Sequence, residues 1–252
     1  MAILLIGLSI LFVCLISVYL GGERNWAFLS KDYQSGNPSR LHVQAQGTFT
    51  TKNTSENEST LEEYIDNTIF IGDSRTRGLA TYHYLPQDNV YAVNGLSHQV
   101  ARNKRFIDLN TGEELTIAEA IGIKKPSRMI VAFGINGLAY MGEENFINEY
   151  ASFLDELKAQ SPNTTLIVQS VLPVSSEKAK DDPRMSNEVI DRYNTLLKNL
   201  IGEKGGFFWN VSPGFKDSQN ALSPEYDSGD GLHFNKTAYE RYIQCLDAYR
   251  KQ

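Results

Sequence analysis

The sequence contains few of the residues that close disulfides or bind metal ions. Only two cysteines occur among its 252 residues. Cys14 lies in an apolar N-terminal stretch, so the rest of the chain holds one cysteine, Cys245, and cannot form an internal disulfide. The four histidines and the cysteines do not cluster at the spacing of metal ligands, which argues against a catalytic zinc.

The sequence also lacks an excess of basic residues. The net charge is −6 at pH 7, whereas a nucleic-acid-binding protein usually needs a basic face. Neither a Gly-x-Gly-x-x-Gly motif nor a phosphate-binding loop is present, and we expect no cofactor. What the sequence does have is 41% hydrophobic residues, enough for the core of one sizeable domain.

The N-terminal residues 2–20 carry no charge and are rich in Leu, Ile and Val. About 20 such residues span the hydrocarbon core of a membrane as a helix. A cleaved signal peptide is the main alternative, but a positively charged start and a clear Ala-x-Ala cleavage site are both missing. We therefore predict a transmembrane anchor over residues 1–22 of a single-pass cell-membrane protein.

The side of the membrane on which the rest of the chain lies is less clearly indicated. Arg24 and Lys31 follow the apolar stretch, and the positive-inside rule would place them in the cytoplasm, whereas Glu23 and Asp32 dilute that signal. Residues 23–59 are polar and read as a stalk. We expect an extracellular catalytic domain over residues 60–252, beginning at the capping-box sequence Thr60-Leu61-Glu62-Glu63.

Within that domain, short apolar runs alternate with helix-compatible segments. This alternation predicts a three-layer α/β/α sandwich around a five-stranded parallel sheet of flavodoxin-like order. The expected strands are Ile69–Ile71, Val90–Val93, Arg128–Phe133, Leu166–Gln169 and Phe207–Trp209. The expected helices are Arg75–Tyr84, Ser97–Lys104, Ile117–Gly122, Glu143–Gln160, Asn187–Glu203 and Lys236–Arg250.

Chemically useful residues follow the expected strands, where such sheets bind their ligands. Ser74, Gly95 and Asn136 come after the first three strands, and Asp230 and His233 precede the last helix. Together they supply a nucleophile, a base and a carboxylate that orients the base. The backbone N–H groups of Ser74 and Gly95 and the side-chain amide of Asn136 can all point at one oxyanion.

These residues resemble the four sequence blocks of the SGNH (GDSL) hydrolase superfamily of esterases and acyltransferases. Gly72-Asp73-Ser74 is similar to the first block, Gly95 to the second, Gly134-x-Asn136 to the third and Asp230-x-x-His233 to the last. The resemblance implies a Ser74–His233–Asp230 triad, an oxyanion hole from Ser74, Gly95 and Asn136, and no metal. The chain departs from the pattern at Arg75, where leucine is usual, and at Gly137, where an acid is frequent.

Two further residues are candidates for substrate contact. Arg75, with Arg77, Arg102 and Arg105, would form a basic rim for an anionic substrate, although solvated helix charges explain these residues equally well. Pro173, in a segment after the fourth strand, would wall the substrate pocket or support the core. We interpret His42, His83 and His98 as surface or structural residues.

These observations lead to one expected function and two alternatives. We expect a membrane-anchored serine esterase that removes a short acyl group, most plausibly acetyl, from a carbohydrate or another small polar ester. The first alternative is an O-acyltransferase that uses the same triad to acylate cell-surface glycans. The second is a non-catalytic surface binding protein, which a complete triad makes less plausible.

Overall fold

The computed structural model describes residues 60–252 of the chain. The predicted anchor (1–22) and stalk (23–59) lie outside the described residues, and both stay predictions.

Five parallel strands form the central sheet, and their order is β2-β1-β5-β6-β7. This is the flavodoxin-like order that the sequence predicts, with β1 and β5 in the middle of the sheet. Both ends of each expected strand lie within two residues of the ends of an observed strand. The strands are β1 (Thr68–Gly72), β2 (Val90–Ala92), β5 (Arg128–Ala132), β6 (Thr165–Gln169) and β7 (Phe207–Trp209).

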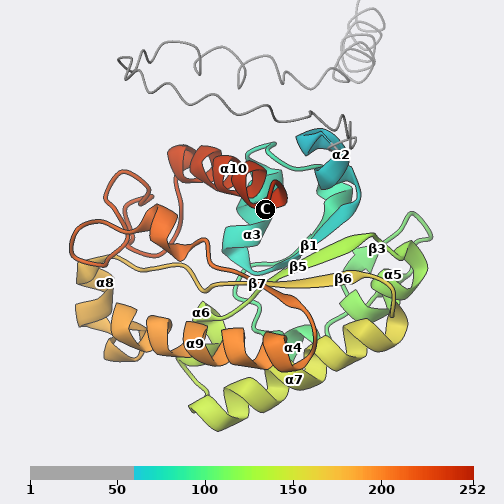
Figure 1. Ribbon diagram of the computed structural model, residues 1–252, viewed down its shortest axis with the longest axis horizontal. Helices are drawn as coiled ribbons and strands as arrows, with labels where there is room; N and C mark the ends of the chain where they lie inside the picture. Colours follow the sequence, from blue (N-terminus) through green and yellow to red (C-terminus); the bar gives the residue numbers. More distant parts are fainter. Residues whose placement is uncertain (1–59) are drawn as a thin grey trace, which may run out of the picture. The chain divides into compact units, whose positions relative to one another are not determined.

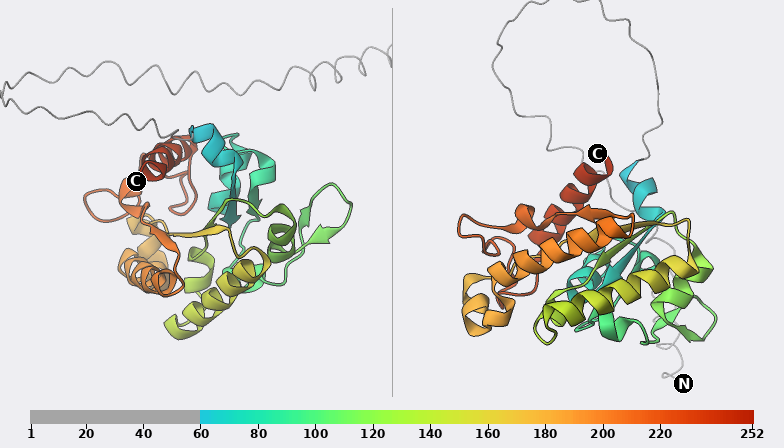
Figure 2. Two further views of the ribbon diagram at one scale, coloured as in Figure 1. Left: turned by 45° about the vertical axis from the view of Figure 1, so that its right-hand side comes forward. Right: turned by 60° about the horizontal axis from the view of Figure 1, so that its bottom comes forward.

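Helices cover both faces of this sheet and make the fold a three-layer sandwich (Figures 1 and 2). One face carries α2 (Leu61–Asp66), α3 (Ser74–Thr81) and α10 (Lys236–Arg250). The opposite face carries α5 (Ile117–Lys124), α7 (Glu143–Gln160) and α9 (Asn187–Glu203). The predicted three-layer α/β/α class is therefore correct for residues 60–252.

The interior strand β1 shows why both faces must be covered. All five of its residues are buried. Ile69 and Ile71 belong to the core cluster that packs on α7 and α9, and Phe70, which alternates with them, points to the other face. A strand that is apolar on both sides is stable only between two helical layers.

Side chains cap several of the helices that the sequence predicts. Asn235 begins α10 and accepts a hydrogen bond from the Ala238 N–H at 3.1 Å, and Ser186 does the same for α9. At Thr60 one half of the expected capping box forms, since its hydroxyl accepts from the Glu63 N–H at 3.1 Å. These caps fix the helix ends on which the connecting loops depend.

Several short elements were not expected from the sequence. They are the hairpin of β3 (Ile107–Asp108) and β4 (Glu114–Leu115), the helices α6 (Ile135–Leu138) and α8 (Ser176–Asp181), and three 3-10 turns, η2 (Gln87–Asn89), η3 (Pro183–Met185) and η4 (Ser212–Phe215). The helix expected over Ser97–Lys104 is shorter, as α4 (His98–Ala101). Of these, α6, α8 and η3 lie in connections that follow carboxyl ends of strands.

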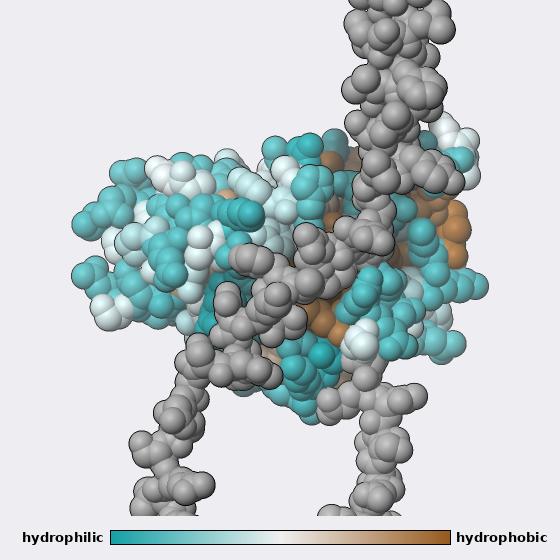
Figure 3. Space-filling view, turned by 90° about the horizontal axis from the view of Figure 1, so that it is seen from above, coloured by the Kyte–Doolittle hydropathy of each residue, from teal (hydrophilic) through white to brown (hydrophobic). Residues whose placement is uncertain are grey.

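No helix among residues 60–252 has both the length and the apolar character that a membrane span requires. Seen from the side of α10, the coloured surface is largely hydrophilic, with small separate hydrophobic areas (Figure 3).

Candidate active site

Ser74 stands at the point where β1 ends and α3 begins. Asp73 is the N-cap of α3, and its Oδ1 accepts a hydrogen bond from the Arg75 N–H at 3.0 Å. This turn leaves the Ser74 side chain half-buried at the carboxyl edge of the sheet. Its Oγ lies 3.1 Å from Nε2 of His233.

His233 and Asp230 come from the loop before α10. The Nδ1 atom of His233 lies 2.6 Å from Oδ2 of Asp230. The other carboxylate oxygen of Asp230 accepts from the backbone N–H groups of Leu232 at 2.9 Å and His233 at 2.7 Å. Gly231 has a φ of +72°, and a Cβ there would lie 2.3 Å from the Ser175 hydroxyl, so this tight turn requires glycine.

Hydrogen bonding keeps Asp230 ionised. Burial opposes the charge, but the donors on the His233 ring and on the His233 and Leu232 backbone outweigh it and lower the pKa of Asp230 well below its usual range. An ionised carboxylate only accepts hydrogen bonds, so Nδ1 of His233 carries a proton and Nε2 is free to accept one. The arrangement can therefore remove the proton of the Ser74 hydroxyl.

Asn136 lies beside this group at the start of α6. Its Nδ2 atom donates to Oδ2 of Asp73 at 3.1 Å and to the carbonyl of Leu96 at 3.3 Å. These contacts connect Asn136 with the residue before Ser74 and with the residue after Gly95. The structure thus brings the three predicted oxyanion donors into one region.

Gly95 is exposed and adopts a φ of +72°. No atom lies within 4 Å of a Cβ built on this residue, so the space in front of its backbone is open.

Asp73 is a site residue to which the sequence analysis gave no role. It is 2% exposed, and burial raises its pKa against the opposing charge of Arg75. Its two oxygens accept from the Arg75 N–H and from Asn136. Its position as a polar residue directly after an apolar strand was the signal that could have found it.

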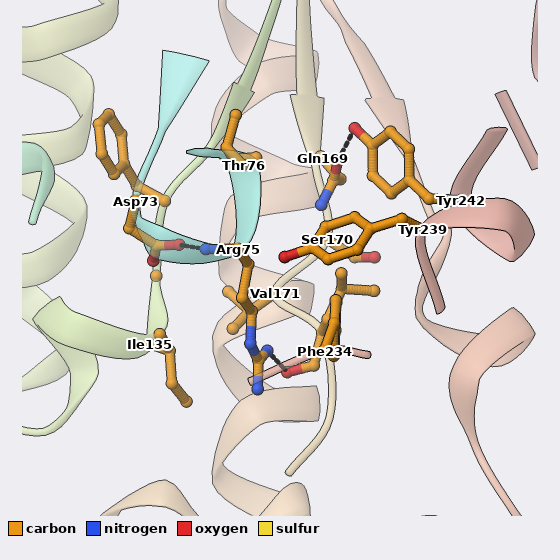
Figure 4. A pocket seen from close by; sticks show the side chains of 14 residues that line it. Asp73, Arg75, Thr76, Ile135, Gln169, Ser170, Val171, Phe234, Tyr239 and Tyr242 are labelled. Atoms are coloured by element: carbon orange, nitrogen blue, oxygen red, sulfur yellow. Dashed lines mark hydrogen bonds between the residues drawn. The ribbon is translucent and has the colours of Figure 1, made fainter. Parts of the chain in front are cut away.

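The structure corrects the prediction that Arg75 contacts substrate. Arg75 is only 8% exposed, and its guanidinium donates to the carbonyls of Leu232 at 2.8 Å, Leu172 at 2.8 Å and Pro173 at 3.0 Å. Figure 4 shows its side chain reaching from the turn at Asp73 toward Phe234. It also lies 4.7 Å above the ring of Phe234. Burial lowers the pKa of Arg75 to about 10, so the side chain stays charged at neutral pH. Arg75 is a structural cation that ties α3 to the His233 loop.

Pro173 has a supporting role of the same kind. It is buried, and its carbonyl is one of the acceptors of Arg75. The neighbouring residues Val171 and Leu172 line a cavity of about 20 Å³ behind the turn at Asp73, which is the size of one water molecule. Neither Ser74 nor His233 lines this cavity, so this part of the segment packs on the core behind the catalytic turn.

Two of the other three arginines of the predicted basic rim are held in ion pairs. Arg102 pairs with Glu149 at 2.8 Å and with Glu156 at 2.6 Å. Arg105 pairs with Glu119 at 3.0 Å. Arg77 is exposed on α3. The solvated-charge interpretation of these residues therefore fits the structure better.

His98 is buried, as one of its two interpretations requires. Its Nε2 lies 3.1 Å from the Phe146 carbonyl, and its ring packs on Phe146 and Tyr150. Burial lowers its pKa to about 4. Among residues 60–252, no group of three His, Cys, Asp or Glu side chains is arranged to hold a metal ion.

Comparison with known proteins gives one family match. Residues 70–241, more than half of the chain, match the model of the GDSL-like lipase/acylhydrolase family. All the site residues described above lie within that range. No curated protein matches the chain.

Solved structures share the fold at low sequence identity. A GDSL-like lipase from Bacteroides thetaiotaomicron has a TM-score of 0.56 and 17% identity over 73% of this chain and 87% of its own. A carbohydrate esterase family 3 protein from Talaromyces cellulolyticus has a TM-score of 0.51 and 15% identity, covering 72% and 94%. A catalytic mutant of an acetylxylan esterase from Geobacillus stearothermophilus has a TM-score of 0.52 and 14% identity, covering 73% and 93%.

Proposed function

Because this chain belongs to the GDSL-like lipase/acylhydrolase family, we propose that it is a serine esterase with Ser74 as nucleophile, His233 as base and Asp230 as the residue that orients the base. The observation that carries the proposal is the continuous hydrogen-bonded row from Ser74 Oγ to Asp230, with contacts of 3.1 Å and 2.6 Å.

The reaction has two steps of acyl transfer. Ser74 Oγ attacks the ester carbonyl while His233 Nε2 takes its proton, and the same proton then leaves with the alcohol. Asp230 stabilises the imidazolium formed in between. Water attacks the resulting acyl-enzyme, with His233 again as base, and the acid is released.

The backbone N–H groups of Ser74 and Gly95 and the amide of Asn136 are the proposed donors to the oxyanion. Both N–H groups of the Asn136 amide donate within the protein, to Asp73 Oδ2 and to the Leu96 carbonyl, so the amide releases or shares one of these hydrogen bonds when it donates to the oxyanion. The two backbone donors belong to the folded chain, and donors that are already oriented stabilise developing charge without reorganising during the reaction.

The proposed substrate is a short, acetyl-type ester of a carbohydrate or another small polar alcohol. The support is the kind of proteins that share the fold, since two of them are described as a carbohydrate esterase and an acetylxylan esterase. Further support is the position of the domain behind a predicted stalk and membrane anchor, which suits work on extracellular glycans.

An O-acyltransferase remains the second candidate function. The same acyl-enzyme would form, and a sugar hydroxyl would replace water in the second step. The open space at Gly95 does not favour water over a sugar hydroxyl as the second nucleophile. The esterase and the acyltransferase are therefore distinguished only by their products.

The proposal is tested by hydrolysis of 4-nitrophenyl acetate. We expect turnover by the wild-type protein and loss of nearly all of it in Ser74→Ala and in His233→Ala. The double variant should lose little more than either single one, because the two residues act as a unit. A fully active Ser74→Ala protein contradicts the assignment. Product analysis with an added sugar acceptor separates hydrolysis from transfer.

A further inference from the structure

Tyr140 is an exposed aromatic residue that the proposed chemistry does not use. It is 84% exposed, more than any other exposed large hydrophobic residue that the structure describes. Its neighbours Ala139 and Met141 are 6% and 9% exposed, and the Met141 carbonyl accepts a hydrogen bond from the Tyr193 hydroxyl at 2.9 Å. The backbone at Tyr140 is therefore fixed, while its ring stands in solvent.

Tyr140 follows the proposed oxyanion donor Asn136 by four residues, just beyond the end of α6. Ala139 continues α6 in the right-handed helical conformation, and the Tyr140 N–H donates to the Gly137 carbonyl at 3.1 Å. Tyr140 therefore lies about one turn beyond Asn136 along the chain, in the connection that follows the carboxyl end of β5.

A guanidinium group covers the ring of Tyr140 from one side. The Cζ atom of Arg184 lies 5.9 Å from the ring centroid. Asp182 holds this guanidinium with two bonds of 2.8 Å, from Nε and from Nη2. The Nη1 group donates to no residue that the structure describes. One face of the aromatic ring is thus flanked by a fixed cation, and the other face is open.

The segment that carries Arg184 borders the catalytic loop as well. At its beginning, the Ser175 N–H donates to the carbonyl of Gly231, next to Asp230, at 2.9 Å. At its end, η3 contacts α6, the helix of Asn136. The connection through α8 and η3 therefore runs from the Asp230 loop to Tyr140 along one side of the site.

We propose that Tyr140 and Arg184 form a platform that binds the sugar ring of the substrate ester, next to Ser74. The axial C–H groups of a pyranose make an apolar face, which packs on the electron-rich face of an aromatic ring. The free Nη1 donor of Arg184 can bind a sugar hydroxyl at the edge of the same ring. The inference rests on the proposed esterase function and adds the residues that select a carbohydrate alcohol.

The test compares sugar esters with a compact ester that has no ring. The substrates are ethyl acetate and mono-O-acetylated xylotriose, cellotriose and chitotriose, and the readout is the ratio of kcat/KM for each sugar ester to that for ethyl acetate. We expect the wild-type protein to prefer at least one sugar ester. In Tyr140→Ala this ratio should fall about 3- to 10-fold, mainly through KM, as expected for the loss of one stacking contact.

Two variants separate stacking from general damage. Tyr140→Phe keeps the ring and should keep the wild-type ratio. Phe207→Ala removes another exposed aromatic side chain, which is 58% exposed. Phe207 is the first residue of β7 and therefore lies at the amino edge of the sheet, opposite the carboxyl edge that holds the site. This variant should also keep the wild-type ratio. Thermal unfolding of each variant shows whether it is folded.

The outcomes also separate this inference from the function on which it rests. If the wild-type protein hydrolyses none of the esters, the proposed function is wrong. If it hydrolyses ethyl acetate through Ser74 but prefers no sugar ester, or if a folded Tyr140→Ala protein keeps the wild-type ratio, the platform alone is overturned.

Discussion

The Nε atom of Arg75 donates a hydrogen bond of 2.8 Å to the carbonyl of Leu232, the residue directly before His233. Arg75 follows the nucleophile in the sequence, and Leu232 precedes the base. The contact therefore fixes the two halves of the catalytic pair relative to each other through a buried cation.

This contact predicts a large effect of Arg75→Met. The variant leaves three carbonyls without their donor and Asp73 without its buried counter-charge. Loss of one partner from such an arrangement costs about 3 kcal/mol or more. Urea unfolding measures the stability, and kcat should fall as the His233 loop shifts. Arg77→Met, at an exposed position of the same helix, is the control and should stay within about 0.5 kcal/mol of the wild-type protein. An equally small effect of Arg75→Met would show that Arg75 is not structural.

Asn136→Ala and Asp230→Asn should impair catalysis in different ways. Asn136 donates to a charge that is fully present only in the transition state, so its loss should lower kcat about 10²–10³-fold with little change in KM. Asp230→Asn disfavours the tautomer in which Nδ1 of His233 carries the proton, and so weakens the base. Raising the pH should not restore Asn136→Ala, since that variant lacks no proton. A raised KM at unchanged kcat in Asn136→Ala would mean that the residue binds the ground state.

His98 predicts a loss of stability in mild acid. Burial lowers its pKa to about 4, whereas an unfolded histidine titrates near 6.5, so the unfolded state binds more protons between these values. The contribution of neutral His98 to the free energy of unfolding is therefore fully present above pH 6.5 and is lost as the pH falls toward 4. From pH 7 to pH 5 this one group should cost about 2 kcal/mol.

Urea unfolding of the wild-type protein and of His98→Gln at both pH values measures this difference. Other groups titrate equally in both proteins, so their effect cancels in the comparison. Between pH 7 and pH 5 the free energy of unfolding of the wild-type protein should fall by about 2 kcal/mol more than that of the variant. His83→Asn, at an exposed position with a φ of +63°, should behave as the wild type does. Parallel losses in the wild-type protein and in His98→Gln would remove His98 as the cause.

The predicted anchor is tested on intact cells. If residues 2–20 span the membrane and the domain lies outside, added protease should release an active fragment by cutting within residues 30–60. A domain that is cut only after lysis would show that the orientation is the reverse.

The sheet and its long helices could be predicted because their signals are local. Buried parallel strands are apolar without interruption, and every expected strand lies within two residues of an observed one. Glu143–Gln160, Asn187–Glu203 and Lys236–Arg250 have the bounds that the sequence predicts, since each has a helical pattern, and Ser186 and Asn235 cap the starts of the last two. The hairpin of β3 and β4 was missed because strands of two residues have no period to detect.

The site shows the same division. Ser74 and Asn136 could be proposed because they follow strand ends, which meet at one edge of a parallel sheet. His233 was proposed from its place before the last helix and from the resemblance of Asp230-x-x-His233 to a family block. The burial of Arg75 could not be found, because its acceptors lie 97, 98 and 157 residues away and arginine is usually exposed. The same limit applies to Asp73, whose link to Asn136 spans 63 residues.

The distance along the chain between Ser74 and His233 has a consequence for folding experiments. The two residues are 159 positions apart, and the contact between them closes almost the whole length of the described domain. Long-range contacts of this kind are slow to form, because the chain entropy of the loop must be lost first. The return of esterase turnover after dilution from denaturant therefore reports the docking of the C-terminal segment onto the finished sheet. Circular dichroism reports the recovery of secondary structure. Comparing the rate of this recovery with the rate at which turnover returns would give the order in which the two ends of the domain assemble.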